Sequence, residues 1–352
     1  MTERGVQSAP RARRTALLAT SAPGLGRMLR RQLGAVDGVE VTGTGFDGSA
    51  DIVFFTADRA GRAEALRSPL AEDVLAEIGR ASRAGGADAA AVAAMAWQPA
   101  GVQRALSVWA DEVRPLAGTM TYRVRGQLRS EARVRRADLR RSIDRLVARD
   151  KPRWRHAESA DLTIWIAEFH DGQYVAGLRL SDAGQPGRAG NRAARPGELP
   201  RTVAAAMVAL APPPGGSQTL LDPCCGSGQV LAAAQAAGWH ADGADIDAAA
   251  VDAAAAAVPG ASVQLGDARE LLLPDASIGA CVSRLPFGLM TDEDWVAAVL
   301  AEMSRVTRSG GSVVLLAPQV PRSVIPAALR LRRQVPLRVL GTAATIWVFR
   351  RA

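Results

Sequence analysis

The chain has 352 residues, of which 48% are hydrophobic and 22% charged, and its formal net charge is +8. This length allows two or three domains with a sizeable core, and the composition is that of a soluble globular protein. The longest apolar run, residues 89–97, is too short for a membrane span of about 20 residues, and no apolar signal region follows the arginines of residues 1–14. Only three cysteines are present, which argues against a disulfide framework and predicts a reducing, cytoplasmic compartment.

The positive charge is concentrated in residues 121–155. This stretch holds 13 basic and 4 acidic residues, a balance of +9 that exceeds the excess of the whole chain. A local basic surface is typical of proteins that bind a polyanion such as nucleic acid. The alternative is an ordinary solvated helix face, because arginine is abundant throughout the chain.

Strand and helix patterns alternate near the N-terminus. Hydrophobic spacing predicts strands at 15–20, 39–45 and 50–56 and helices at 23–33 and 61–67. This β-α-β-β-α order is similar to a small ferredoxin-like α+β unit, which we expect over residues 15–80. Residues 1–14 are expected to form a flexible N-terminus. Residues 70–118 are alanine-rich and are expected to be mostly helical.

A second domain is expected over residues 81–182. Its later part reads as a strand at 120–126, an arginine-rich helix at 136–149, and two strands at 160–169 and 173–181. An Asp171–Gly172 turn is expected to join the last two strands as a hairpin. Residues 183–210 then combine a linker rich in glycine, proline and arginine with the start of a helix predicted at 199–211.

Residues 211–352 show regular alternation of strands and helices. Apolar strand patterns at 218–225, 240–247, 261–268, 278–288 and 312–318 are separated by helical ones. This alternation predicts a parallel sheet that is covered by helices on both faces. Two further strand patterns flank Gly341 and predict an antiparallel hairpin at the C-terminus.

A glycine-rich turn follows the first strand of this region, in the sequence LLDPCCGSGQV (220–230). Gly226 and Gly228 permit a tight turn and a close approach of the backbone to a ligand, and the next helix offers unpaired N–H groups. An acidic residue on the following strand would reach ribose hydroxyls, and Asp245 lies 245 − 222 = 23 residues after Asp222. The turn therefore predicts a nucleotide-like cofactor, with a purely structural turn as the alternative.

The Asp-Pro-x-Cys-Gly-Ser-Gly turn resembles the first motif of S-adenosylmethionine-dependent methyltransferases. Later segments resemble the family in the same order: Asp245 its ribose-binding acid, Asp267 the residue that meets the adenine amine, and residues 283–288, SRLPFG, its Asn-Leu-Pro-Phe/Tyr-Gly motif. The resemblance implies S-adenosylmethionine as cofactor and a Rossmann-like α/β domain whose mostly parallel seven-stranded sheet ends in an antiparallel hairpin. It implies these cofactor-binding residues: Asp222, Pro223, Cys224, Gly226, Gly228, Asp245, Ile246, Asp267, Ala268 and Ser283. No CxxC motif or His/Cys cluster indicates a metal, so none is expected.

The SRLPFG motif departs from the family at one position. In relatives that methylate an amine, an Asn or Asp side chain and the proline region accept hydrogen bonds from the amine, while the aromatic ring stacks on the base. The resemblance implies catalytic roles for Ser283, Arg284, Leu285, Pro286 and Phe287. However, Arg284 stands at the acceptor position, and arginine only donates. Three readings are open: the substrate presents an acceptor or phosphate to Arg284, Ser283 or another group replaces the lost acceptor, or the protein binds S-adenosylmethionine and RNA without efficient transfer.

Residues 15–352 as a whole resemble the THUMP-domain RNA methyltransferases, on the segments 17–33, 121–181 and 198–211. The resemblance implies a THUMP-like domain that binds tRNA through phosphate contacts and shape, and methylation of the exocyclic N2 of a guanine by a monomer. The alternatives are the same scaffold acting on another base, a protein amide or a small metabolite, and a catalytically weak RNA-binding protein that retains the cofactor pocket. The candidate RNA contacts are Arg123, Arg125, Arg135, Arg136, Arg140 and Arg141.

Overall fold

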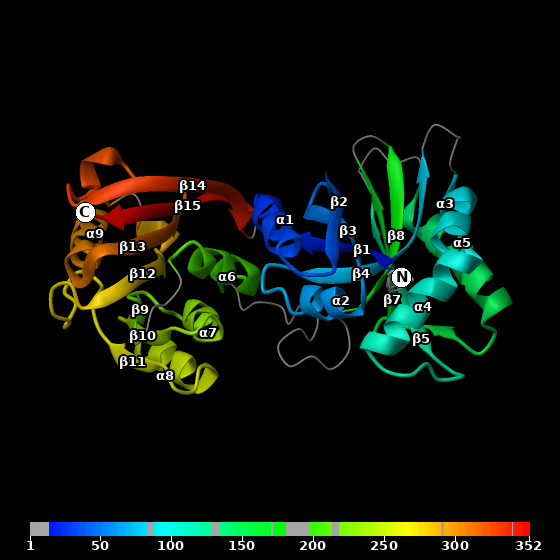
Figure 1. Cartoon of the computed structure of the whole chain (residues 1–352), viewed down its shortest axis with the longest axis horizontal. Helices are drawn as coiled ribbons and strands as arrows, with labels where there is room; N and C mark the ends of the chain where they lie inside the picture. The colour runs from blue at the N-terminus through cyan, green and yellow to red at the C-terminus, as the bar shows by residue number, and fades with distance from the viewer. Residues whose placement is uncertain are drawn as a thin grey trace, which may run out of the picture. The chain divides into compact units, whose positions relative to one another are not determined.

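The computed structural model describes residues 14–82, 88–128, 134–169, 172–180, 198–212, 218–289, 292–339 and 341–352. The chain divides into two compact units, residues 1–20 with 29–190 and residues 21–28 with 191–352, and each unit contains its own sheet (Figure 1). The predicted flexible N-terminus up to residue 13, the linker at 183–197 and Asp171 of the predicted turn lie outside the described residues. Within the described ranges, no helix is both long and apolar enough to cross a membrane.

The first unit is built on one eight-stranded sheet with the strand order β2-β3-β1-β4-β8-β7-β5-β6. Its strands are β1 (Thr15–Ser21), β2 (Val39–Phe46), β3 (Asp51–Ala57), β4 (Asp73–Ser82), β5 (Thr121–Gln127), β6 (Arg155–His156), β7 (Leu162–Glu168) and β8 (Gln173–Arg179). The helices in this part of the chain are α1 (Gly26–Gly34), α2 (Arg59–Leu66), α3 (Ala89–Ala96), α4 (Pro99–Glu112) and α5 (Arg136–Asp150). The elements predicted over residues 15–67 are thus present in the predicted order.

Strand β4 corrects the prediction that residues 70–118 are mostly helical. This strand pairs with β1 on one side and with β8 on the other, and Val74, Leu75 and Ala76 are at most 1% exposed. A strand that is buried on both faces reads as a continuous apolar run, which periodicity cannot distinguish from a helix. Alanine and leucine also favour helices, so the local signal pointed the wrong way.

The second unit contains a seven-stranded sheet with the order β11-β10-β9-β12-β13-β15-β14. Its strands are β9 (Thr219–Asp222), β10 (His240–Asp245), β11 (Ser262–Leu265), β12 (Ile278–Arg284), β13 (Thr307–Ala317), β14 (Leu329–Val339) and β15 (Thr342–Arg351). Strands β9 to β13 pair in parallel, whereas β15 is antiparallel to both β13 and β14. The predicted α/β sheet and its terminal antiparallel hairpin around Gly341 are confirmed.

Helices cover both faces of this sheet, namely α6 (Arg201–Ala209), α7 (Gln229–Ala236), α8 (Ala248–Ala257) and α9 (Glu293–Val306). Helix α9 buries Val296, Leu300 and Met303, spaced by four and three residues, against a core that includes alternate residues of β13. Its N-terminus is capped by Asp292, whose Oδ1 accepts a hydrogen bond from Trp295 N at 3.0 Å. The Trp295 ring packs partly against the same core.

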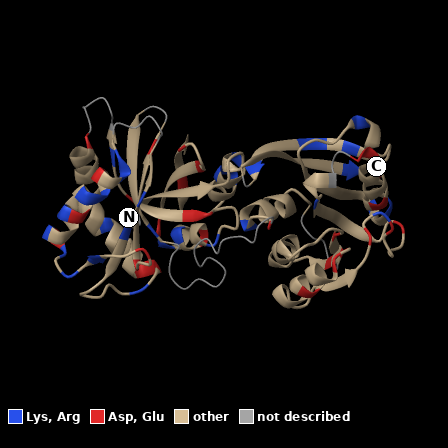
Figure 2. Ribbon diagram, turned by 180° about the vertical axis from the view of Figure 1, so that it is seen from behind, with Lys and Arg blue, Asp and Glu red and all other residues tan. Residues whose placement is uncertain are grey.

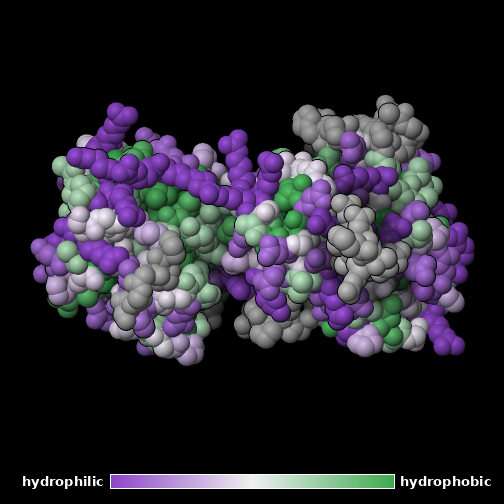
Figure 3. Space-filling model, in the orientation of Figure 1, coloured by the Kyte–Doolittle hydropathy of each residue, from purple (hydrophilic) through white to green (hydrophobic). Residues whose placement is uncertain are grey.

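Strand order reverses next to β9, because β10 follows on one side and β12 on the other. In open α/β sheets ligands bind outside the carboxyl ends of the strands at such a switch point. The opposite edge of the sheet is β14, whose residues 330–334 are exposed and carry three arginines. Hydrophilic side chains run along this strand in Figure 3.

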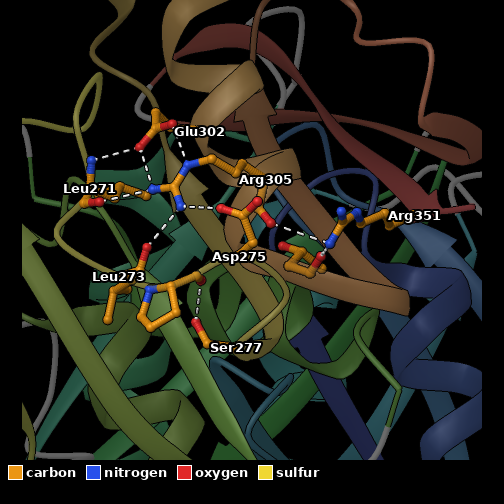
Figure 4. A network of polar contacts seen from close by, with 9 residues as sticks. Leu271, Leu273, Asp275, Ser277, Glu302, Arg305 and Arg351 are labelled. Carbon is orange, nitrogen blue, oxygen red and sulfur yellow. Dashed lines mark hydrogen bonds and ion pairs between the residues drawn. The ribbon is translucent and has the colours of Figure 1, made fainter.

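Arg305 near the end of α9 anchors the connection between β11 and β12 (Figure 4). Its guanidinium binds both carboxylate oxygens of Glu302 at 2.7 and 2.8 Å and Oδ1 of Asp275 at 2.7 Å. The same group donates to the carbonyl oxygens of Leu273 and Leu271 at 2.8 and 2.9 Å. One side chain therefore holds the connection that contains the predicted adenine-binding residue, Asp267.

We expect Arg305→Met to lower the free energy of unfolding by roughly 2 kcal/mol, because it leaves carbonyl and carboxylate groups without their charged donor. Amide hydrogen exchange over residues 271–277 should accelerate as well. The control is Arg67→Met, which breaks an Arg–Glu pair with Glu64 on the exposed side of α2 and should change stability by less than about 0.5 kcal/mol. Equal effects of the two substitutions would contradict the anchoring role.

Candidate active site

The glycine-rich turn connects the end of β9 to the start of α7. Gly226 and Gly228 both have positive φ, at 50° and 83°. A Cβ on Gly228 would lie 2.9 Å from Val258 Cγ2, so a side chain there would be both strained and blocked. Nothing lies within 4 Å of the position that a Cβ on Gly226 would occupy. The backbone at Gly226 therefore faces open space, which is what a ligand that approaches the main chain requires.

Asp245 ends β10 beside this turn. Its Oδ2 accepts a hydrogen bond from Gly226 N at 2.8 Å, and its Oδ1 accepts one from Asp247 N at 3.1 Å. These bonds aim the carboxylate at the switch point, and a carboxylate is the acceptor that a ribose diol needs. The next residue, Ile246, is 72% exposed and offers an apolar surface beside it.

Asp267 follows β11, and the neighbouring Gly266 N donates to the Asp245 carbonyl at 3.0 Å. The Asp267 carboxylate is held by Arg269, whose backbone N, Nε and Nη2 donate at 2.8, 3.0 and 2.6 Å. These hydrogen bonds lower the pKa of Asp267 below its usual value. An adenine amine would therefore share this carboxylate with Arg269. Ala268 beside it is only 5% exposed.

Asp222 and Ser283 join the first and fourth strands of the domain. Ser283 Oγ donates to Asp222 Oδ1 at 2.6 Å, and Cys224 N donates to the same oxygen at 3.2 Å. Ser283 is fully buried and Asp222 is 2% exposed, so the Ser283 side chain serves Asp222 rather than a substrate. Burial raises the pKa of Asp222 to about 7, although its two hydrogen bonds oppose this rise.

The neighbouring thiols are not set up as nucleophiles. Burial raises the pKa of Cys225 to about 12 and raises the pKa of Cys224 as well, with the charge of Asp222 adding to both effects. Thiols with such pKa values remain protonated at neutral pH and react slowly. The two cysteines therefore act as small residues of the turn.

An open pocket lies in front of the turn. It is lined by Asp222 and residues 224–227, by Glu198 and Leu199 before α6, by the first residues of α7, and by Arg284 at the end of β12. The Arg284 guanidinium carbon lies 5.9 Å from the centroid of the Phe287 ring, which is half-buried. Leu285 between them is fully buried, whereas Pro286 is half-buried.

Glu198 is a residue of this pocket that the sequence analysis missed. Its Oε1 accepts hydrogen bonds from Ser227 Oγ at 3.1 Å and from Gln229 Nε2 at 2.7 Å. In the sequence it is a single acidic residue before a predicted helix, and nothing there indicates that the chain returns to the turn. Among the described residues, no group of three or more His, Cys, Asp or Glu side chains could hold a metal ion.

The six arginines predicted to bind RNA lie on two separate surfaces of the first unit. Arg135, Arg136, Arg140 and Arg141 are exposed at the start of α5, and Figure 2 shows basic residues along this helix. Tyr122 Oη donates to Asp144 of α5 at 2.8 Å, so even-numbered residues of β5 face this helix. Arg123 and Arg125 therefore lie on the opposite face, where Arg123 Nε donates to Thr163 Oγ1 at 2.9 Å.

We expect Asp222→Asn to remove a pH dependence of stability in the protein without ligand. The folded-state pKa of about 7 exceeds the unfolded value of about 4. The folded state therefore binds a proton more tightly, and the wild type loses stability as pH rises through this window. The melting temperature of the variant, relative to that of the wild type, should increase between about pH 5 and about pH 8.

The matched control for this experiment is Asp252→Asn, an exposed position on α8. Its melting temperature should follow that of the wild type across the same pH range. A constant difference between Asp222→Asn and the wild type would show that Asp222 is ionised in the folded protein throughout.

Comparison with known proteins agrees with this geometry. The family model for the methyltransferase domain matches residues 220–311, which include the glycine-rich turn, Asp245 and Arg284. No curated protein matches the chain. Two of the matching solved structures share the fold along nearly the full chain. TrmN from Thermus thermophilus has a TM-score of 0.75 and 20% identity, over 96% of this chain and 100% of that chain.

The second structure is a predicted N6-adenine-specific DNA methylase from Listeria monocytogenes. It has a TM-score of 0.67 and 17% identity, over 97% of each chain. At such identities the likeness concerns the fold alone. The matched domain contains the turn and the strand ends described above, and their open backbone and acceptor groups fit a sulfonium nucleoside. The protein is therefore a methyltransferase, with S-adenosylmethionine as its cofactor.

Proposed function

We propose that this enzyme methylates tRNA, at the exocyclic N2 amine of a guanine, in the cytoplasm. The observation that carries the proposal is the exposed arginine cluster at the start of α5, in a chain that also contains a methyltransferase domain. Double-helical RNA is bound chiefly through its phosphates and its shape, which suits such a cluster. TrmN from Thermus thermophilus shares the fold along 96% of this chain, which supports the same scaffold.

The architecture of the first unit supports ferredoxin-like and THUMP-like parts. Strands β1 to β4 follow the chain order β-α-β-β-α-β and have the sheet order β2-β3-β1-β4, as a ferredoxin-like unit would. The remaining strands, β5 to β8, continue the same sheet beside the basic helix α5. The domain boundaries that we expect from the sequence remain part of this proposal.

The motif at the end of β12 supplies the groups for an amine acceptor. The half-buried Phe287 ring can stack on a base, and the carbonyl group of the half-buried Pro286 can accept a hydrogen bond from its amine. S-adenosylmethionine supplies an electrophilic methyl group, so the contribution of these residues is to hold the amine nitrogen in line with it. Arg284 cannot accept such hydrogen bonds, and this observation favours a second candidate, transfer to a different acceptor.

Nucleoside analysis separates these candidates. The purified full-length protein is incubated with total tRNA and methyl-labelled S-adenosylmethionine, and the digested nucleosides are identified by mass spectrometry. Label in N2-methylguanosine is the expected result. Label in another nucleoside would show that the methyl group goes to that nucleoside and not to guanine N2. Cofactor binding without label in any RNA would refute the proposal in favour of an RNA-binding protein.

We expect two substitutions in the site to have different effects. Asp245→Ala should weaken cofactor binding about tenfold, because hydrogen bonds to the ribose are lost. Phe287→Ala should slow single-turnover transfer at least about tenfold and leave cofactor affinity within about twofold, because only stacking of the acceptor is lost. Calorimetry and rapid-quench rates measure the two quantities, with Asp252→Ala as a control. If Asp245→Ala and Phe287→Ala changed cofactor affinity equally and also changed the transfer rate equally, the assigned roles would be contradicted.

Charge reversal tests the arginines at the start of α5. Arg136 and Arg140 are four residues apart on the exposed side of the helix, and we expect their double substitution by Glu to weaken tRNA binding more than about tenfold near 0.1 M salt. The dependence of affinity on salt should also become less steep, because fewer counterions are released. The control is the same double substitution at Arg330 and Arg332, which changes the net charge equally. Equal losses would mean that total charge, and not this helix, attracts the RNA.

A further inference from the structure

The pocket in front of the glycine-rich turn contains one acidic and one basic side chain whose purpose the proposed function leaves open. These are Glu198, which precedes α6, and Arg284, at the end of β12. Both line the pocket that Gly226 and Ser227 also line. The third acidic or basic side chain of the lining, Asp222, is 2% exposed and already accepts the two hydrogen bonds described above. The other two, one carboxylate and one guanidinium, are complementary to a ligand that carries both charges itself.

The Glu198 carboxylate is held in place against the pocket wall. Its Oε1 accepts hydrogen bonds from both Ser227 Oγ and Gln229 Nε2, at 3.1 and 2.7 Å. These two donors belong to the turn and to the first residue of α7, so the carboxylate is attached to the cofactor loop itself. A carboxylate positioned in this way is suited to bind an ammonium group.

The Arg284 guanidinium lies on the β12 side of the same pocket. It is half-buried, and its charge opposes the rise in the pKa of Asp222 that burial causes. Its carbon lies 5.9 Å from the Phe287 ring centroid, so the side chain extends between the turn and the aromatic ring. Planar guanidinium groups bind carboxylates through two parallel hydrogen bonds.

The sheet order places the strand ends that carry Asp245 and Arg284 on different sides of β9. Asp245, the expected ribose ligand, ends β10, whereas Arg284 ends β12, and these strands flank β9. Asp245 does not line the pocket that contains Glu198 and Arg284. A ligand whose ribose lies at Asp245 and whose chain crosses the open backbone at Gly226 would therefore extend its other end toward these two side chains.

S-adenosylmethionine carries an α-amino acid at that other end, with one ammonium and one carboxylate group. We infer that Glu198 binds the ammonium group and Arg284 the carboxylate group of this amino-acid tail. The inference rests on the cofactor assignment and on the proposed ribose contact of Asp245, and it does not depend on which RNA is methylated. It gives Arg284 a partner in the cofactor, and the backbone carbonyl of the half-buried Pro286 then remains for the acceptor.

Ligands that lack parts of the tail test the inference by calorimetry. S-adenosylhomocysteine has both charged groups, decarboxylated S-adenosylmethionine lacks the carboxylate, and 5′-methylthioadenosine lacks the entire amino acid. We expect Glu198→Gln to weaken binding of the first two ligands at least about tenfold, and Arg284→Gln to weaken only the first to that extent. Both variants should bind 5′-methylthioadenosine within about twofold of the wild type.

Arg308→Gln is the matched control, because it removes an exposed guanidinium of the same domain outside the pocket. It should leave the affinity for all three ligands unchanged. The inference is overturned if either pocket variant weakens 5′-methylthioadenosine as much as S-adenosylhomocysteine, or if neither variant weakens the latter. It is also overturned if Arg284→Gln leaves all affinities unchanged and slows only transfer to RNA, because Arg284 would then meet the acceptor.

Failure of the proposed function is distinguishable from failure of this inference. The affinities of the variants for the three ligands are measured without RNA, so they can agree with the inference while the tRNA assay gives no methylated guanosine. Conversely, N2-methylguanosine can form in the tRNA assay while the ligand affinities of the Glu198 and Arg284 variants contradict the inference.

Discussion

The hydrogen bond from the Ser283 hydroxyl to the buried Asp222 carboxylate is the interaction on which the site depends. It joins β9 to β12, the two neighbouring parallel strands between which the strand order of the sheet reverses. The cofactor turn leaves from one end of this bond, and the motif from Arg284 to Phe287 leaves from the other. Because both side chains are shielded from water, neither can find a replacement partner easily, and an unpaired group there would be costly.

Two further contacts extend this arrangement across the sheet. The bond from Gly226 N to Asp245 attaches the turn to β10, and Arg305 attaches the connection after β11 to α9. The ends of β12, β9 and β10, together with the connection that follows β11, are thereby held by side chains and not only by the sheet ladder. Such rigidity suits a reaction in which the enzyme contributes mainly position, since a small displacement of the acceptor or donor slows transfer greatly.

The sequence predicted the second unit better than the first, for a physical reason. Carboxyl ends of parallel strands meet at one edge, so the spacing of Asp222, Asp245 and Asp267 was enough to bring them together. Strand β4 was missed because burial on both faces removes the alternation that marks a strand. The burial of Ser283 and the approach of Glu198 to the turn depend on contacts between distant segments, which spacing along the chain does not reveal. The separation of Arg123 and Arg125 from α5 likewise depends on which face of β5 the helix covers.

The open edge of the second sheet has a consequence for how the protein behaves in a crowded solution. Leu331 is 47% exposed on β14, and an apolar residue on an edge strand invites another chain to add to the sheet. Arg330, Arg332 and Arg333 surround it, so a second molecule that docked there in an antiparallel manner would bring guanidinium groups against one another. This electrostatic repulsion opposes self-association through the edge strand. Dissolved salt screens the repulsion, so self-association through this edge would increase with ionic strength.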